Sequence, residues 1–143
     1  MKKINCLITG ITGMVGSHLV DFLLKNTDWN IYGLLRWSSK LDNIEHHLEK
    51  INKKKRLFLL YGDLTDHISI RSAINESLPN YVFHLAAETF PKMSFEASIK
   101  FYDTNIKGTQ ILLEEIKNLK TINPVVHICS SSEVFGKVKK KDL

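Results

Sequence analysis

The most constraining feature of this sequence is a glycine-rich turn between an apolar run and a helical pattern. The run from Ile4 to Ile8 is typical of a buried strand. Three glycines follow at a spacing of three residues, at Gly10, Gly13 and Gly16. Apolar residues then recur at helical period, at Val15, Leu19 and Leu23. This order predicts a phosphate-binding turn, because the glycines allow a tight turn and a close approach of the backbone to a diphosphate.

The segments that flank the glycines decide whether this pattern indicates a nucleotide-binding turn. Three glycines alone also occur in turns that bind nothing. Here they open the chain and lie between a convincing strand and a convincing helix, which favours nucleotide binding. The N–H groups of the first helical turn would then point at the phosphates, and the helix dipole would add a favourable potential.

The length of 143 residues allows one domain with a real core, so we expect a single domain over residues 1–143. A hydrophobic fraction of 43% and a charged fraction of 24% are typical of globular proteins. The net charge is +5, and basic residues cluster at 53–56 and 137–141. Neither cluster is interleaved with aromatic residues on one face, which favours solvated surface over a nucleic-acid site.

Targeting and cysteine usage indicate a reducing compartment. No apolar run approaches the ~20 residues that span a bilayer, so we expect no membrane partner. The first apolar run is too short for a secretion signal, which predicts a cytoplasmic location. Cys6 and Cys129 fall in predicted core strands without metal-ligand spacing, and we expect both to be buried free thiols.

Apolar runs alternate with helical patterns along the whole chain. The predicted strands are 4–8, 31–35, 57–61, 81–87 and 124–129. The first predicted helix includes Val15, Leu19 and Leu23 and ends near residues 26–28, and the later helices are predicted at 41–51, 66–78 and 95–119. Asp66 is the expected N-cap of the third helix. Continuously apolar strands that alternate with helices predict an α/β fold, a doubly wound parallel sheet of the Rossmann type in three α/β/α layers, with strand order 3-2-1-4-5.

Ligands of such sheets lie beyond the carboxyl ends of the strands, so the residues there are the candidates for binding. The second strand ends in Arg36, followed by Ser38 and Ser39, with no acid at the position that holds the ribose hydroxyls of NAD. A guanidinium and two hydroxyls suit a phosphate dianion, so we expect NADP rather than NAD. The alternative is an exposed arginine on a surface loop.

The other strand ends also carry polar or small residues. Asp63 could accept from an adenine amino group while Leu64 packs on the ring, although aspartate is common in turns. Small residues where a nicotinamide ribose or diphosphate would pass close are Leu85, Ala86 and Ala87. Three hydroxyls and a carboxylate at 130–133 are either ligand-competent or a polar loop.

The six histidines form no convincing metal or catalytic set in the sequence. His18, His46, His47 and His67 fall in predicted helices or on the surface, and His84 and His127, in strands, are expected to be structural.

Five motifs in order resemble those of the extended short-chain dehydrogenase/reductase (NAD-dependent epimerase/dehydratase) family. They are residues 9–16, 62–66, 84–87, 104–109 and 130–136, which cover nearly the whole chain. Within that family the chain is most similar to the GDP-mannose 4,6-dehydratase branch, through residues 8–13, 35–39, 61–66 and 132–138. This resemblance implies a lyase that uses NADP and a nucleotide-diphosphate sugar. The expected cofactor-binding residues are Thr9, Gly10, Thr12, Gly13, Met14, Val15, Gly16, Arg36, Ser38, Ser39, Asp63, Leu64, Leu85, Ala86 and Ala87.

The resemblance also implies a mechanism and two catalytic residues. Enzymes of this branch oxidise C4 of the hexose, remove water across C5 and C6, and return the hydride to C6. Ser131 matches the Ser or Thr that hydrogen-bonds the C4 oxygen, and Glu133 matches the base that removes the C5 proton. Some decarboxylases and epimerases of the family also carry a glutamate there, so an epimerase or reductase stays an alternative.

The chain departs from the family in its catalytic base. The family uses a tyrosine with a lysine four residues later, and no tyrosine here has one. Smaller departures are Phe135, where tyrosine is usual, and the pair Met14 and Val15. We therefore expect the chain to be inactive alone, either as the cofactor-binding part of a dehydratase or as a non-catalytic NAD(P)-binding module. The resemblance suggests a homo-oligomer, and an exposed apolar edge is expected at the fifth strand.

Overall fold

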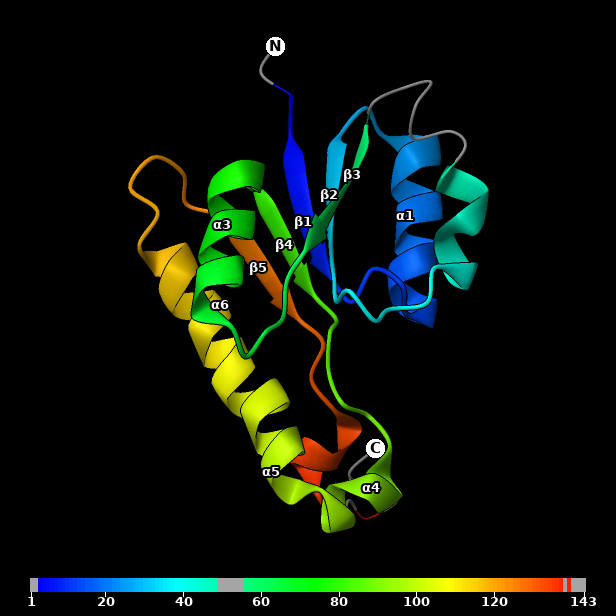
Figure 1. Cartoon of the computed structure of the whole chain (residues 1–143), viewed down its shortest axis with the longest axis vertical. Coiled ribbons are helices and arrows are strands. Elements are labelled where there is room, and N and C mark those ends of the chain that lie inside the picture. Colours follow the sequence, from blue (N-terminus) through cyan, green and yellow to red (C-terminus); the bar gives the residue numbers. More distant parts are fainter. Residues whose placement is uncertain (1–2, 49–55, 138, 140–143) are drawn as a thin grey trace.

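The computed structural model describes residues 3–48, 56–137 and 139 and contains one parallel sheet (Figure 1). The five strands lie in the order β3-β2-β1-β4-β5, and every neighbouring pair is parallel. Their bounds are Asn5–Thr9 for β1, Asn30–Leu35 for β2, Leu57–Tyr61 for β3, Tyr81–His84 for β4 and Val125–Ile128 for β5. The α/β fold class and the strand order expected from the alternation of runs are confirmed.

Helices cover both faces of this sheet, which confirms the three layers. Figure 1 shows α1 on one side and α3 and α6 on the other. The α-helices with both ends among the described residues are α1 at Met14–Asn26, α3 at His67–Ser77, α4 at Pro91–Glu96, α5 at Ser98–Phe101 and α6 at Gly108–Lys117. Short 3-10 turns occupy Asp42–Ile44 and Ser132–Phe135, and a π-helical segment occupies Tyr102–Lys107. Among the described helices, none has the length and apolar character to cross a bilayer.

Two apolar clusters hold these layers together, one on each face. Leu7 of β1 packs into a cluster with Ile70 and Ile74 of α3 and Leu112 of α6. The neighbouring strand residue Ile8 points to the other face and packs in a cluster that includes Val20 and Leu23 of α1. Successive strand residues point to opposite faces, so a run that is apolar at every position fills both clusters.

The third helix begins as the sequence predicts. The Asp66 carboxylate accepts hydrogen bonds from the backbone N–H groups of Ile68 and Ser69, at 3.1 and 3.2 Å. These bonds satisfy two of the donors that a helix N-terminus leaves free. The helix ends at Ser77, and Leu78 follows with a φ of 38°, in the left-handed region.

Two predicted helices are wrong in extent. The helix expected over 95–119 is divided into α4, α5, the π-helical segment and α6. Gly108 packs so tightly at the start of α6 that an added Cβ would lie 2.8 Å from the Cβ of Leu64. The helix expected over 41–51 begins as the 3-10 turn and continues as α-helix over 45–48, and its last three residues lie outside the described part.

Two predictions fail near the carboxyl ends of β4 and β5. Strand β4 ends at His84 instead of Ala87, because the N–H groups of the next two residues turn to Thr9. Cys6 is buried as expected, and burial raises the pKa of its thiol to about 12. Cys129 is exposed, so the expectation of a second buried thiol was wrong. It follows the last residue of β5, an edge strand whose Val125 is 62% exposed.

Candidate functional site

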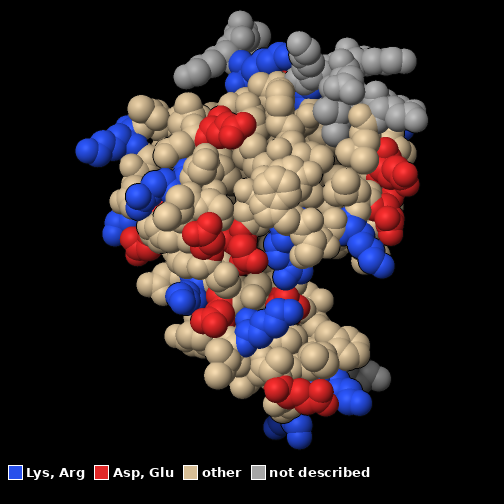
Figure 2. Space-filling view, in the orientation of Figure 1, with Lys and Arg blue, Asp and Glu red and all other residues tan. Residues whose placement is uncertain are grey.

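A cleft of about 470 Å³ lies at the carboxyl ends of the strands, where the topology places ligands. Of the predicted cofactor-binding residues, all except Thr9 and Ser38 line it. Basic and acidic side chains are interspersed over the face shown in Figure 2. The predicted residues that line it therefore share one cavity, although they come from four different strand ends.

The glycine turn forms the floor of this cleft at the start of α1. Gly10 has a φ of +73°, and an added Cβ there would lie 2.9 Å from the backbone N of Ala86. An added Cβ at Gly16 would lie 2.4 Å from the Gly10 carbonyl oxygen, so α1 packs directly on the turn. The N-cap residue Gly13 makes no side-chain cap, which leaves the first N–H groups of the helix available to an anion.

Thr9 supports the cleft from beneath. Its buried hydroxyl accepts from the N–H groups of Leu85 and Ala86, at 3.2 and 3.1 Å. Its own proton is therefore donated to Nδ1 of His84, 2.8 Å away. Thr9 thus fixes the loop after β4 against the glycine turn, and its contact with a cofactor stays a prediction.

His84 continues this network away from the cleft. Since Nδ1 accepts from Thr9, the ring carries its proton on Nε2 and donates it to the Thr109 hydroxyl at 2.9 Å. The Thr109 hydroxyl donates in turn to the Asn105 carbonyl at 2.7 Å. Burial lowers the pKa of His84 to about 4, so the ring is neutral at physiological pH. The prediction that His84 is structural agrees with this geometry.

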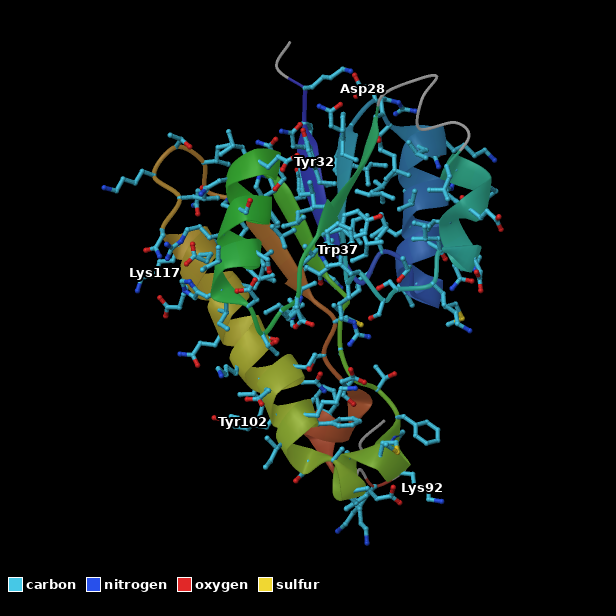
Figure 3. The ribbon with its side chains drawn as sticks, in the orientation of Figure 1. Asp28, Tyr32, Trp37, Lys92, Tyr102 and Lys117 are labelled. Carbon is cyan, nitrogen blue, oxygen red and sulfur yellow. The ribbon has the colours of Figure 1, made fainter. Side chains whose placement is uncertain are left out.

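The tip of β2 forms the wall of the cleft that was assigned to a 2′-phosphate. The Ser39 hydroxyl accepts from the Arg36 backbone N–H at 3.1 Å, and Ser39 N–H donates to the Arg36 carbonyl at 3.0 Å. These two bonds close a tight turn that leaves Ser38 exposed. Trp37 stacks on Tyr61 with ring centroids 4.0 Å apart, beside the ends of β2 and β3 (Figure 3).

The Arg36 guanidinium pairs with a carboxylate across the cleft. Its Nη1 lies 3.2 Å from Oε1 of Glu88, which also lies 3.2 Å from Nζ of Lys100. The Glu88 backbone is held by both polar atoms of the Asn105 side chain. Glu88 was not predicted as a site residue, because its ion pair with Arg36 joins two strand ends that are far apart in the chain.

Two further walls of the cleft come from the ends of β3 and the π-helical segment. Oδ1 of Asp63 accepts from both the N–H and the hydroxyl of Thr65, at 2.9 and 2.7 Å. This turn is the alternative that the sequence left open for Asp63, and the residue lines the cleft at the same time. Thr104 also lines the cleft and was missed as a site residue. Its motif was visible, but its orientation depends on the π-helical segment.

The predicted catalytic residues lie just beyond β5. Ser131 is exposed and is not among the residues that line the cleft, and its carbonyl accepts from the Val134 N–H at 3.3 Å. Glu133 belongs to the 3-10 turn Ser132–Phe135, and its side chain lies outside the described part of the structure. The cleft therefore brings together the cofactor candidates and leaves the two catalytic candidates as predictions.

Two histidines that were assigned no site from the sequence lie together in the structure. His46 and His47 both reach the carboxylate of Asp21 on α1. The sequence did not indicate this arrangement, because Asp21 lies more than twenty residues away from both histidines in the chain.

Comparison with known proteins identifies relatives over nearly the whole chain. The family model described as GDP-mannose 4,6 dehydratase matches residues 7–143. GDP-mannose 4,6 dehydratase of Homo sapiens is 37% identical over 139 residues, which are 94% of this chain and 37% of that protein. The Drosophila melanogaster enzyme is 38% identical over 137 residues, which are 92% of this chain and 34% of that protein. The chain thus spans little more than a third of these curated relatives.

A solved structure of a related enzyme has the same fold as this chain. The dTDP-glucose 4,6-dehydratase of Bacillus anthracis, crystallised in complex with NAD, superimposes with a TM-score of 0.74 and 28% identity. The match covers 96% of this chain and 40% of that one.

Proposed function

This chain belongs to the GDP-mannose 4,6 dehydratase family, and we propose that it forms the NADP-binding part of a nucleotide-sugar 4,6-dehydratase. The observation that carries the proposal is the cleft, in which the glycine turn and Arg36 face one cavity. The backbone N–H groups at the start of α1 would hold the diphosphate. Arg36 would hold the 2′-phosphate that distinguishes NADP from NAD.

The ion pair of Arg36 with Glu88 does not oppose this role. The Arg36 side chain is 54% exposed, so turning it towards a ligand costs little. Glu88 keeps a cation when Arg36 leaves, because Lys100 lies at the same oxygen. A phosphate dianion would then gain the guanidinium without leaving a carboxylate unpaired.

The cofactor, when bound, would accept and return the hydride of the reaction. Leu85, Ala86 and Ala87 line the cleft with small or apolar groups and give room for the nicotinamide half. Ser131 would hydrogen-bond the C4 oxygen of the sugar, and Glu133 would remove the C5 proton once C4 is oxidised. The 143 residues contain no tyrosine with a lysine four positions later, so the complete reaction is proposed for a protein that supplies this pair.

Calorimetric titration of the chain with NADP and with NAD tests the proposal. We expect NADP to bind about tenfold or more tightly than NAD, because a charge-assisted hydrogen bond contributes about 1.5–3 kcal/mol. The variant Arg36→Gln should lose that preference by weakening NADP binding and leaving NAD binding within about twofold. The matched control is Lys117→Gln, which removes one exposed charge on α6, far from the cleft (Figure 3).

Each other outcome of the titration has a defined meaning. Equal binding of both cofactors by the unchanged chain would refute the role of Arg36 and favour an NAD-dependent member of the family. Binding of neither cofactor would refute the proposed cofactor site altogether.

A further inference from the structure

A second cluster of titratable side chains lies on the far side of α1, away from the cleft. It consists of Asp21 on α1 and the adjacent residues His46 and His47 in the helical segment 45–48, and no residue of it lines the cleft. Nε2 of His46 lies 3.0 Å from Oδ1 of Asp21, and Nε2 of His47 contacts the same oxygen. The two imidazole rings have centroids 4.0 Å apart. Two histidines thus share one carboxylate oxygen.

One buried polar atom of this cluster lacks a hydrogen-bond partner. The His47 side chain is only 8% exposed, and its Nδ1 is the one buried side-chain polar atom without a hydrogen-bond partner among the described residues. Its Nε2 faces Oδ1 of Asp21, as does Nε2 of His46. The cluster is therefore a carboxylate with two adjacent imidazoles.

We propose that Asp21, His46 and His47 bind a divalent transition metal ion of the zinc class. One ligand atom from each residue lies within 4.8 Å of the others. Ligands around a tetrahedral Zn²⁺ at about 2.0–2.2 Å lie roughly 3.3 Å apart, so small side-chain rotations close the site. Two imidazoles and one carboxylate suit Zn²⁺, Co²⁺ and Ni²⁺ better than Mg²⁺ or Ca²⁺, which take oxygen ligands.

The remaining coordination position is open to water or to His18. Its Nδ1 lies 3.9 Å from Oδ2 of Asp21, one helical turn earlier, and its side chain is 79% exposed and can rotate. The affinity of the site has an upper limit, because His47 has no partner for the Nδ1 proton it would carry as an Nε2 ligand. Missing support of this kind weakens metal binding by about 10–100-fold relative to a site whose histidines are fully hydrogen-bonded.

A metal ion here would stabilise the position of segment 42–48, which runs beside the glycine turn. Ile44 is fully buried, and Nδ2 of Asn43 donates to the Thr12 carbonyl at 2.9 Å. The segment therefore contacts the glycine turn through Asn43 and α1 through the histidines. An ion that ties His46 and His47 to Asp21 stabilises the folded state, because it does not find these ligands together in the unfolded chain.

The test is a titration of the chelator-treated, tag-free chain with Zn²⁺, followed by calorimetry and thermal melting. We expect one ion per chain and a rise in Tm with Zn²⁺ concentration. Asp21→Asn and the double variant His46→Gln, His47→Gln should each weaken binding by about 30-fold or more, with the helical circular dichroism signal retained. His18→Gln should weaken binding by about tenfold or less.

The matched control is His67→Gln. His67 also faces a carboxylate, at 2.9 Å from Oε1 of Glu115, but it lies on α3 outside the cluster. This variant should bind Zn²⁺ like the unchanged chain. Titration with Co²⁺ adds a geometric measurement, since the intense visible absorption of four-coordinate Co²⁺ should appear in step with binding and be absent from the double variant. Failure to saturate at one ion, or equal binding by the double variant, would overturn the proposal.

Discussion

Strands β1 and β5 carry the two ends of the proposed site, and their surroundings differ. Residues 6–9 of β1 are completely buried between the helices, and the glycine turn follows directly. In β5, Val125 is 62% exposed and Ile128 is 42% exposed, and Ser131 follows. β1 pairs in parallel with both β2 and β4, whereas β5 pairs only with β4 among the described strands and so has one open edge.

Packing around these two strands shows which part of the proposed site is held in place by the described residues. The glycine turn is fixed by close backbone contacts, a hydroxyl network and two apolar clusters. The segment after β5 lies at the edge of the sheet, and its exposed residues include Val134 and Phe135. The cofactor side is therefore held by core packing, whereas the proposed catalytic side has little of it among the described residues.

The largest expected effect comes from replacing a glycine by alanine in the region around the glycine turn, compared with the same replacement in the region after β5. Gly16→Ala would place a Cβ 2.4 Å from the Gly10 carbonyl oxygen and 2.9 Å from the Ile11 Cα, so backbone must move. We expect a loss of about 3 kcal/mol or more in the free energy of unfolding, measured by urea denaturation.

The matched substitution is Gly136→Ala, after β5. Gly136 has a φ of +61°, and an added Cβ meets no atom within 4 Å. Its cost is therefore only backbone strain, about 1 kcal/mol. Equal losses in the two variants would contradict the view that packing around the glycine turn distinguishes the two regions.

The next largest expected effect is the pH dependence of the free energy of unfolding that arises from His84 in the buried network on β4. The pKa of His84 is lowered to about 4 in the folded state, against 6.5 in the unfolded chain. The unfolded state therefore binds the extra proton first, and the stability contributed by the neutral ring is lost as the pH falls from 6.5 towards 4. Between pH 8 and pH 5 the loss should be about 2 kcal/mol.

The variant His84→Gln isolates this contribution. Its absolute stability falls because the bonds to Thr9 and Thr109 change, so the quantity to compare is the difference in unfolding free energy between the two pH values. We expect that difference to shrink by about 2 kcal/mol in the variant. An unchanged difference would mean that His84 does not titrate as a buried neutral ring.

The contrast between the regions also separates what the sequence could predict from what it could not. Strand order and the glycine turn were predictable, because apolar periodicity and glycine spacing are local properties of residues such as Leu7 and Gly16. Asp66 was predictable as an N-cap for the same reason. The division of the helix over 95–119 was not, because its apolar pattern continues through a π-helical segment whose geometry depends on tertiary contacts such as that of Gly108 with Leu64.

The candidate site shows the same division. Residues at strand ends, such as Arg36 and Asp63, were predictable from topology and line the cleft. The partner of Arg36 at Glu88 was not, since it depends on two loops meeting across the cleft. Cys129 was misplaced because a continuous apolar run does not show where an edge strand stops or which of its faces stays exposed.

The smallest expected effect concerns the exposed face of the edge strand β5. It is measured by making the same valine-to-threonine substitution on β5 and on its neighbour β4. Val125→Thr on β5 changes a side chain that is 62% exposed, so we expect a change within about 0.5 kcal/mol. Val82→Thr on the neighbouring β4 buries a hydroxyl in the cluster beneath α3 and α6 and should cost about 1–2 kcal/mol. Urea denaturation of both variants measures the two changes under one condition. A loss at Val125 as large as that at Val82 would show that the face of β5 is covered in solution, and the association state of the chain would then have to change when Val125 is made polar.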